Sequence, residues 1–169
     1  MKTIKNFRGY YSFLSNFSNN KIKFKNYIFE NSESVFQVQK FDYNDQLLRA
    51  FSVLNPSDAK KYGRAKILFL NNETYELASN KRPYYWENYI EFRMTPDWND
   101  RKIESMYNSV RLKFSQNPEI KEKLIETDGY YLEESNTWGD RFWGTVNGEG
   151  ENNLGIILMQ VRDEFIKNR

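Results

Sequence analysis

The sequence predicts a mostly helical α+β fold, a single domain over residues 1–169 with a small N-terminal β-hairpin. Apolar and polar residues alternate in one short segment near the N-terminus, residues 22–30, which is typical of a hairpin. Most later segments instead repeat their apolar residues at helical spacing. A chain of 169 residues is also the size of one ordinary domain with a core of its own.

The N-terminal half is predicted to hold the hairpin and three helices. The hairpin reverses near Asn26-Tyr27, and the period becomes helical at Asn31, where Asn31 or Ser32 can cap the first helix. The second helix stops before Pro56, because proline disfavours helical geometry in the residue that precedes it. The three helices are predicted at residues 31–40, 45–54 and 57–62. No element is predicted for residues 66–94, which show no clear period.

The C-terminal half is predicted to hold three more helices. Thr95-Pro96-Asp97-Trp98 is a strong helix start, with a cap, a proline in the first turn and an acid that suits the helix dipole. This helix is expected to run to about Ser115, and the others to span 118–125 and 154–167. The buried face of the first is predicted at Ile103, Met106, Tyr107, Val110 and Phe114. The last helix should pack into the core through Ile157, Leu158, Val161 and Phe165.

The composition excludes several classes of protein and of chemistry. With 25 basic and 23 acidic residues, the chain is too balanced to bind nucleic acid by bulk charge, so any such contact must be local. It has 0 Cys and 0 His, which excludes disulfides and thiolate metal sites, and we expect that no metal is required, although carboxylates could still hold Mg²⁺. We also expect no cofactor. The N-terminus lacks the apolar run of a signal peptide, and no segment is apolar enough to span a membrane. We therefore expect a cytoplasmic protein with no membrane partner. If it is an enzyme, carboxylates, lysine, tyrosine and water must carry the chemistry.

The segment of residues 31–40 is the first candidate for a functional site. In a helix, Glu33, Gln37 and Lys40 share one face, because spacings of four and seven residues return to nearly the same direction. An acid, an amide and an amine would then form one column about 10 Å long. A solvated polar stripe is the alternative interpretation of this pattern.

Three further segments carry residue types that suit a binding site. Asn16 and Phe17 lie in an aromatic-bracketed polar segment, which can also be a simple turn. Trp98 and Arg101 open a helix, where the Trp can close a cleft or pack in the core. The third segment, residues 140–155, is rich in Gly and Asn and leads into a helix. Such a loop can offer backbone N–H groups to a phosphate or be a structural turn. It fits neither a Walker loop nor the dinucleotide fingerprint.

In this order, the segments resemble the NADAR (NAD- and ADP-ribose-associated) family of N-glycosidases. The matching motifs are Ser15-Asn16-Phe17, Ser32-Glu33 through Gln37 to Lys40, Trp98 with Arg101/Lys102, Asp140-Arg141-Phe142-Trp143-Gly144, and Gly150-Glu151-Asn152-Asn153-Leu154-Gly155. The resemblance covers nearly the whole chain, except that residues 66–94 are poorly anchored. One departure stands out, because Ser34 occupies the position at which the family usually has a histidine.

The resemblance implies a mostly helical α+β enzyme that cleaves a ribose C1–N bond. It assigns catalytic roles to Glu33, Lys40 and the second carboxylate, Asp140. A lysine whose pKa is lowered by burial can attack C1, and a carboxylate can stabilise an oxocarbenium-like state. The expected substrate-binding residues are Asn16, Phe17, Gln37, Arg64, Trp98, Arg101, Trp143, Gly144, Gly150 and Asn152. Among them, Trp98 and Trp143 are candidate stacking walls, while Arg64, Arg101 and the amides of residues 148–153 are candidate phosphate contacts.

Two kinds of substrate follow from the resemblance, and both place a ribose C1–N bond next to phosphate. The first is ADP-ribose attached to guanine in DNA, so that ADP-ribosylated nucleic acid would be the partner. The short, Asn- and Lys-rich chain without a fused domain would suit a stand-alone antidote to a DNA ADP-ribosyltransferase toxin, encoded by a phage. The alternatives are a ribosylamine phosphate of the riboflavin pathway and a non-catalytic module that binds ADP-ribose or NAD. Retention of both Glu33 and Lys40 argues against the module.

Overall fold

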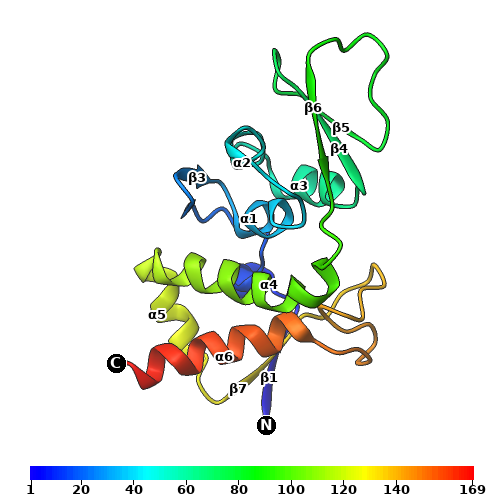
Figure 1. Ribbon diagram of the computed structural model, residues 1–169. Coiled ribbons are helices and arrows are strands. Elements are labelled where there is room, and N and C mark those ends of the chain that lie inside the picture. Colours follow the sequence, from blue (N-terminus) through cyan, green and yellow to red (C-terminus); the bar gives the residue numbers. More distant parts are fainter. The chain divides into compact units, whose positions relative to one another are not determined.

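The structure is a computed structural model that describes all of residues 1–169. By their internal contacts the residues form two compact units. The first unit comprises residues 1–20 and 106–169, and the second comprises residues 21–105. Figure 1 shows the elements of both. The long helix α4, Trp98–Ser115, begins in the second unit and continues into the first.

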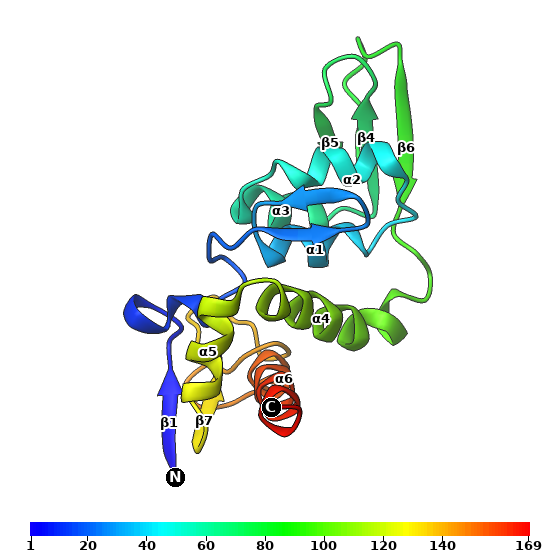
Figure 2. The same cartoon turned by 90° about the vertical axis from the view of Figure 1, so that its left-hand side faces the viewer.

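The first unit is built on a pair of parallel strands and two helices. Strands β1 and β7 lie side by side in Figure 2 and pair in the register Lys2↔Tyr130 to Lys5↔Glu133. Helix α6 packs against β7 and against α5. The bounds are β1 Lys2–Lys5, the 3₁₀ helix η1 Gly9–Leu14, α5 Pro118–Glu126, β7 Tyr130–Glu133 and α6 Asn153–Lys167. This arrangement joins the two ends of the chain within one unit.

The second unit combines a hairpin, three short helices and an antiparallel sheet. Helix α1 packs against α2, α3 and the hairpin, so that it is buried along its whole length. The bounds are β2 Ile22–Phe24, β3 Tyr27–Phe29, α1 Ser32–Val38, α2 Asp45–Ser52, α3 Pro56–Gly63, β4 Ile67–Asn71, β5 Leu77–Ser79 and β6 Tyr89–Arg93. The sheet has the order β5-β4-β6.

Asparagine caps start all three short helices of the second unit. The side chains of Asn31, Asn44 and Asn55 each accept a hydrogen bond from a backbone N–H three residues later. Each bond satisfies a donor that the first turn of a helix leaves unpaired. These local bonds explain why short helices with few turns begin at defined residues. The predicted cap at Asn31 is thereby confirmed.

The predicted fold class is confirmed, with differences in its details. Helix α1 ends at Val38 and α2 at Ser52, each two residues earlier than predicted. The sheet β4–β6 and the pair β1–β7 were not predicted, because their short strands are separated in the sequence, whereas the alternation of the hairpin runs continuously over residues 22–30. Ile103 is 42% exposed, so its assignment to the buried face of α4 was wrong, whereas Met106, Val110 and Phe114 are buried there.

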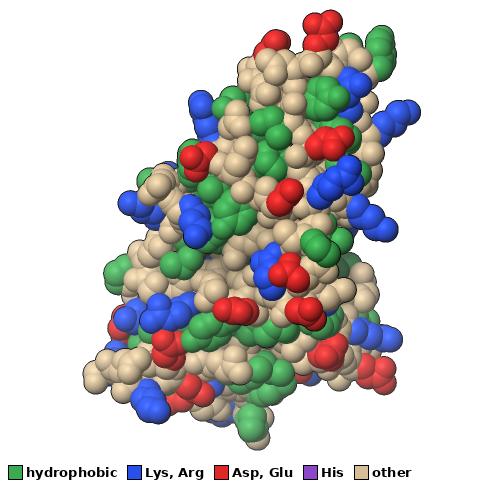
Figure 3. All heavy atoms as spheres, viewed as in Figure 1, with side chains coloured by type: hydrophobic (Ala, Val, Ile, Leu, Met, Phe, Trp, Pro, Cys, Tyr) green, Lys and Arg blue, Asp and Glu red, His purple; other side chains and the backbone are tan.

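Aromatic side chains fill much of the interior of each unit. Phe29, Phe41 and Phe51 are fully buried in the second unit, and Phe114 in the first. On the face seen in Figure 3, basic and acidic side chains are interspersed, in keeping with the balanced composition. None of the helices is both long and apolar enough to cross a membrane.

Candidate active site

Glu33 and Gln37 form a buried hydrogen-bonded pair on α1. The amide Nε2 of Gln37 donates to Oε1 of Glu33 at 2.8 Å, and both side chains are at most 7% exposed. Glu33 lies in the first turn, where the helix dipole favours a negative charge. The interpretation of this column as a solvated stripe is therefore wrong, because the acid and the amide are buried.

Lys40 lies in the turn that follows α1. Its backbone N–H bonds to the carbonyl of Gln37, a 3₁₀-type contact, so the helical column does not extend to Lys40 as predicted. The amine Nζ instead donates to the carbonyl oxygen of Gly63 at 3.1 Å. It also lies 5.8 Å from the ring centroid of Phe36 and 5.9 Å from that of Trp98. The amine is thus held between two aromatic rings and the end of α3.

The surroundings of Lys40 lower the pKa of its amine below the ordinary value. Burial is the largest cause, since desolvation disfavours the ammonium form. The positive charges of Arg64 and Lys102 lower the pKa further, and the negative charge of Glu33 opposes them. A larger fraction of Lys40 is therefore the neutral, nucleophilic amine than in an exposed lysine.

Trp98 and Arg101 belong to the same cluster. The Trp98 ring is buried and packs 5.4 Å from Phe36, so most of its surface is already covered by protein. The Arg101 guanidinium lies 5.2 Å from the Trp98 ring and donates to Asp97, Thr95 and the carbonyl of Gln39. Contact of either residue with a ligand stays a prediction, and their contacts with the protein position the first turn of α4 beside α1.

Ser34 and Arg64 differ sharply in their surroundings. Ser34 is fully buried, and its hydroxyl donates to the carbonyl of Asn31 within the same helix. The side chain that replaces the usual histidine is thus part of the helix cap. Arg64 caps the C-terminal end of α3 and is exposed. Its charge acts on Lys40, so a phosphate contact at Arg64 would also affect the lysine.

Asp140 serves the local structure of its loop. One carboxylate oxygen accepts from the backbone N–H groups of Phe142 and Trp143 at 3.0 and 2.9 Å. The side chain of Asn136 bonds both the N–H and the carbonyl of Asp140. These bonds explain why an acid suits this position without invoking catalysis, and the predicted catalytic role of Asp140 stays a prediction. Trp143 is partly exposed, with its ring edge-on to Phe142.

Close packing accounts for three of the predicted binding residues in the loop. A Cβ at Gly144 would lie 2.0 Å from the carbonyl of Glu134, and Gly150 has a φ of 148°, which favours glycine. The buried side chain of Asn152 accepts from the N–H of Glu134 and donates to the carbonyl of Leu132. These residues fasten the start of α6 to the end of β7.

The amides of the same loop are mostly used within the protein. The N–H groups of Glu149, Glu151, Asn152 and Asn153 all donate to backbone carbonyls of residues 141–146. The prediction of a phosphate cradle at residues 148–153 is therefore wrong for these four. The residues of the loop bond to one another, which is the structural-turn alternative.

Asn16 and Phe17 follow η1 in the first unit. Asn16 is buried and its amide lies 3.2 Å from the sulfur of Met106. Phe17 is 41% exposed, which leaves part of its ring accessible. The segment is fastened by Lys113 of α4, whose Nζ donates to the carbonyls of Phe13 and Ser15 at 2.7 and 2.8 Å.

The structure brings together five of the predicted residues in the second unit. They are Glu33, Gln37, Lys40, Trp98 and Arg101, with Arg64 acting on Lys40 through its charge. The other predicted residues lie in the first unit. Gly63 was not predicted as a site residue, although it accepts the bond from Lys40 and a Cβ there would overlap Gln37. The Gly63-Arg64 pair in the sequence was the available signal.

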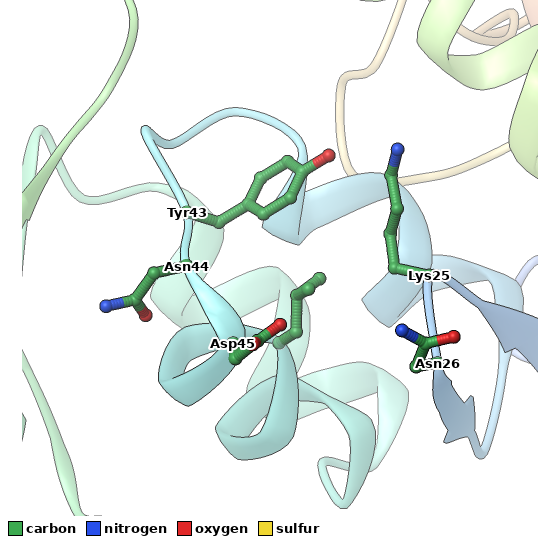
Figure 4. A pocket seen from close by; sticks show the side chains of 6 residues that line it. Lys25, Asn26, Tyr43, Asn44 and Asp45 are labelled. Atoms are coloured by element: carbon green, nitrogen blue, oxygen red, sulfur yellow. The ribbon is translucent and has the colours of Figure 1, made fainter.

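A cavity of the second unit shares no residue with this cluster. It has a volume of about 460 Å³ and is lined by Lys25, Asn26, Tyr43, Asn44, Asp45 and Leu48. Figure 4 shows Lys25 and Tyr43 on either side of it, and none of the predicted residues lies there. No group of three or more His, Cys, Asp or Glu residues is arranged to hold a metal ion.

Comparisons with known proteins agree with the motifs. Residues 5–166 match the NADAR domain. The N-glycosidase YbiA of Shigella flexneri is 30% identical over 159 residues, which cover 92% of this chain and 82% of that protein. The riboflavin biosynthesis protein VVA0006 of Vibrio vulnificus is 34% identical over 156 residues, 92% of this chain and 36% of that protein.

The remaining comparisons concern a plant protein and a solved structure. The chloroplastic riboflavin biosynthesis protein PYRR of Arabidopsis thaliana is 46% identical over 71 residues, 41% of this chain, and the match spans only 12% of that protein. The NMR structure of the E. coli protein YbiA has a TM-score of 0.73 and 25% identity, covering 99% of this chain and 86% of that one. The chain belongs to the NADAR domain family.

Proposed function

We propose that this chain is an N-glycosidase that hydrolyses a ribose C1–N bond, and that residues 1–169 act as one functional domain. The cluster of Glu33, Gln37 and Lys40 carries the proposal. A buried lysine with a lowered pKa is a nucleophile, and a buried glutamate is a proton carrier. The relatives named YbiA are N-glycosidases by name, and the YbiA of Shigella flexneri aligns with 92% of this chain at 30% identity.

In the proposed reaction, the Glu33 carboxylate first takes a proton from the Lys40 ammonium, and the neutral Lys40 amine then attacks C1 of the ribose. The C1–N bond breaks, and the base leaves with the bonding electrons and takes a proton from the acid form of Glu33. The sugar ring then opens to a protonated imine on Lys40, as the ring oxygen takes one proton from the lysine nitrogen. Water adds to the imine carbon, the aldehyde of the sugar forms, and the free amine and the protonated Glu33 are restored. Gln37 keeps Glu33 in place throughout.

The proposed substrate is ADP-ribose attached to guanine in DNA, and the product is the repaired base with free ADP-ribose. This reading follows the family resemblance and the Asn- and Lys-rich composition of a phage-encoded antidote to a DNA-modifying toxin. A second candidate is a phosphorylated ribosylamine intermediate, and the names of the Vibrio and plant relatives favour it. Both substrates use the same cluster, because both present a ribose C1–N bond.

One incubation separates these candidates. The purified protein is mixed in parallel with ADP-ribosylated single-stranded DNA, with NAD and with a ribosylamino-pyrimidine phosphate, and products are read by mass spectrometry. We expect free ADP-ribose and unmodified DNA from the first mixture, and no product with Glu33→Gln. Release of ribose 5-phosphate from the third mixture alone would favour the second candidate. Tight binding of ADP-ribose without any product would instead indicate a non-catalytic module that binds ADP-ribose.

A further inference from the structure

The segment between β5 and β6 displays two tyrosines to solvent. Tyr84 is 91% exposed and Tyr85 66% exposed, and their rings lie edge to face at 5.5 Å. Figure 1 shows the segment as a long loop that stands off the sheet. Contiguous exposed apolar surface marks interaction sites more often than single exposed side chains do, and tyrosine is enriched at interfaces. Neither the cluster around Lys40 nor the core of the second unit uses this pair.

The loop is held in one shape by bonds within it. The guanidinium of Arg82 donates to the carbonyls of Pro83, Tyr84 and Trp86, and lies 4.4 Å from the ring of Tyr89. Trp86 is buried and fastens the segment to the unit. The two tyrosines are therefore presented on a fixed loop, which lowers the entropy that binding would remove.

The loop has a weakly basic character. Residues 80–88 contain the cations Lys81 and Arg82 and the single acid Glu87. Lys81 is exposed, whereas Arg82 is partly buried by its bonds to the loop. The charge alone cannot hold a polyanion firmly, so a ligand of this loop must gain most of its affinity from the rings.

We propose that this loop binds single-stranded nucleic acid by stacking Tyr84 and Tyr85 on bases that flank the modified one, with Lys81 beside a phosphate. The proposal rests on the proposed function, in which the substrate is a base within DNA. Stacking of this kind tolerates any sequence, because every base has a planar face. It also provides the local contact that a chain of nearly balanced charge needs to hold DNA.

The binding test uses a fluorescein-labelled single-stranded oligonucleotide of about 12 nucleotides without ADP-ribose, followed by anisotropy. We expect Tyr84→Ala and Tyr85→Ala each to weaken binding by roughly 5- to 100-fold. Lys81→Gln should lower the slope of log affinity against log salt by about 0.7. Tyr10→Ala is the matched control, since Tyr10 is a tyrosine of the first unit that is 63% exposed, and it should bind as the wild type does.

A turnover test separates this loop from the proposed function. The variants are compared on an ADP-ribosylated oligonucleotide and on ADP-ribosylated deoxyguanosine, which has no flanking bases. A KM of the variants that is raised only for the oligonucleotide supports the loop. Absence of turnover by the wild type on both substrates refutes the proposed DNA substrate, while the anisotropy still tests the loop. Wild-type protein that binds no oligonucleotide, or a double variant that binds as well as wild type, overturns the loop proposal. The proposal is also overturned if the wild type is a dimer and the double variant is a monomer, because the two tyrosines would then contact a second copy of the chain.

Discussion

The amine of Lys40 donates a hydrogen bond to the carbonyl oxygen of Gly63, which ends helix α3. Gly63 also lies against the side chain of Gln37, so one residue touches two members of the cluster. The absence of a side chain at Gly63 lets α1 and α3 approach closely enough for both contacts. The position of the nucleophile in the proposed reaction thus depends on a residue that has no chemistry of its own.

We predict that Gly63→Ala displaces Gln37. A Cβ at this position would lie 1.9 Å from Oε1 and 2.5 Å from Cδ of Gln37, so the amide must move away from Glu33. Unfolding in urea should show a loss of about 1–3 kcal/mol from overpacking, and turnover should fall by up to about 100-fold from misplacement. The double variant Gly63→Ala/Gln37→Ala is the control, and it should recover stability but not turnover. Normal turnover in Gly63→Ala would show that the reaction does not depend on the position of Gln37.

We predict that two charge-removing variants shift the titration of Lys40 in opposite directions. Glu33 raises the pKa of Lys40, so Glu33→Gln should move its titration to lower pH. Arg64 lowers that pKa, so Arg64→Gln should move the titration to higher pH. The rate of acetylation of Lys40 by acetic anhydride, mapped by peptide mass spectrometry across pH, measures both. Shifts in the same direction would contradict the opposite effects of Glu33 and Arg64 on Lys40.

The sequence predicted the helices of the site better than the positions of its side chains. Helix α1 was found because Asn31 is a local cap, and the membership of Glu33 and Gln37 in one column follows from the helical period alone. The helix was predicted two residues too long, because it ends at Val38, but Lys40 still lies near Glu33 and Gln37 through its bond to Gly63. The contact of Lys40 with Trp98 joins residues far apart in the chain, and no local pattern contains it.

The strands show the same limit of local information. The pair β1–β7 joins residues 2–5 to residues 130–133, and its four-residue strands carry too few positions for a period to be seen. In the loop of residues 140–155, the sequence indicated that Gly and Asn matter but left their purpose open. The structure accounts for Asn152 through its bonds to β7, a partner that lies about 20 positions earlier.

We predict that the wild type gains stability relative to Lys113→Met as the pH rises. Burial lowers the pKa of Lys113 from 10.5 to about 7, so between these values the unfolded chain binds a proton that the folded chain does not. Wild-type stability should then rise with pH across this window relative to the variant, by up to about 1.4 kcal/mol per pH unit. Urea unfolding at several pH values measures the difference.

The control for Lys113 is Arg162→Met. Arg162 is also a buried side chain that donates to backbone carbonyls, those of Thr127 and Tyr130, and arginine is not deprotonated in proteins. Its stability difference from wild type should not change with pH. Parallel curves for the two variants would show that Lys113 keeps its proton when buried.

We predict that turnover does not need a metal ion. The chain has 0 His and 0 Cys, and no three acidic side chains are grouped as ligands for an ion such as Mg²⁺. Activity should persist in excess chelator with unchanged kcat. Loss of turnover that added Mg²⁺ restores would contradict this prediction and would point to carboxylates that assemble around the substrate.

The most direct prediction concerns a covalent bond to Lys40. If the amine attacks C1, an imine between lysine and the opened sugar exists during turnover, and borohydride should reduce it to a stable amine. The added mass should map to Lys40 and be absent from Lys40→Arg, which keeps a positive charge but is a poor nucleophile. Trapping should also increase as pH rises through the lowered pKa of Lys40, because only the neutral amine attacks. Lys60 is a natural internal control, since it is a lysine of α3 in the same unit and should gain no mass. Wild-type turnover without trapping, together with an active Lys40→Arg, would instead favour direct attack by water assisted by Glu33. Lys40 would then contact a hydroxyl or phosphate of the substrate.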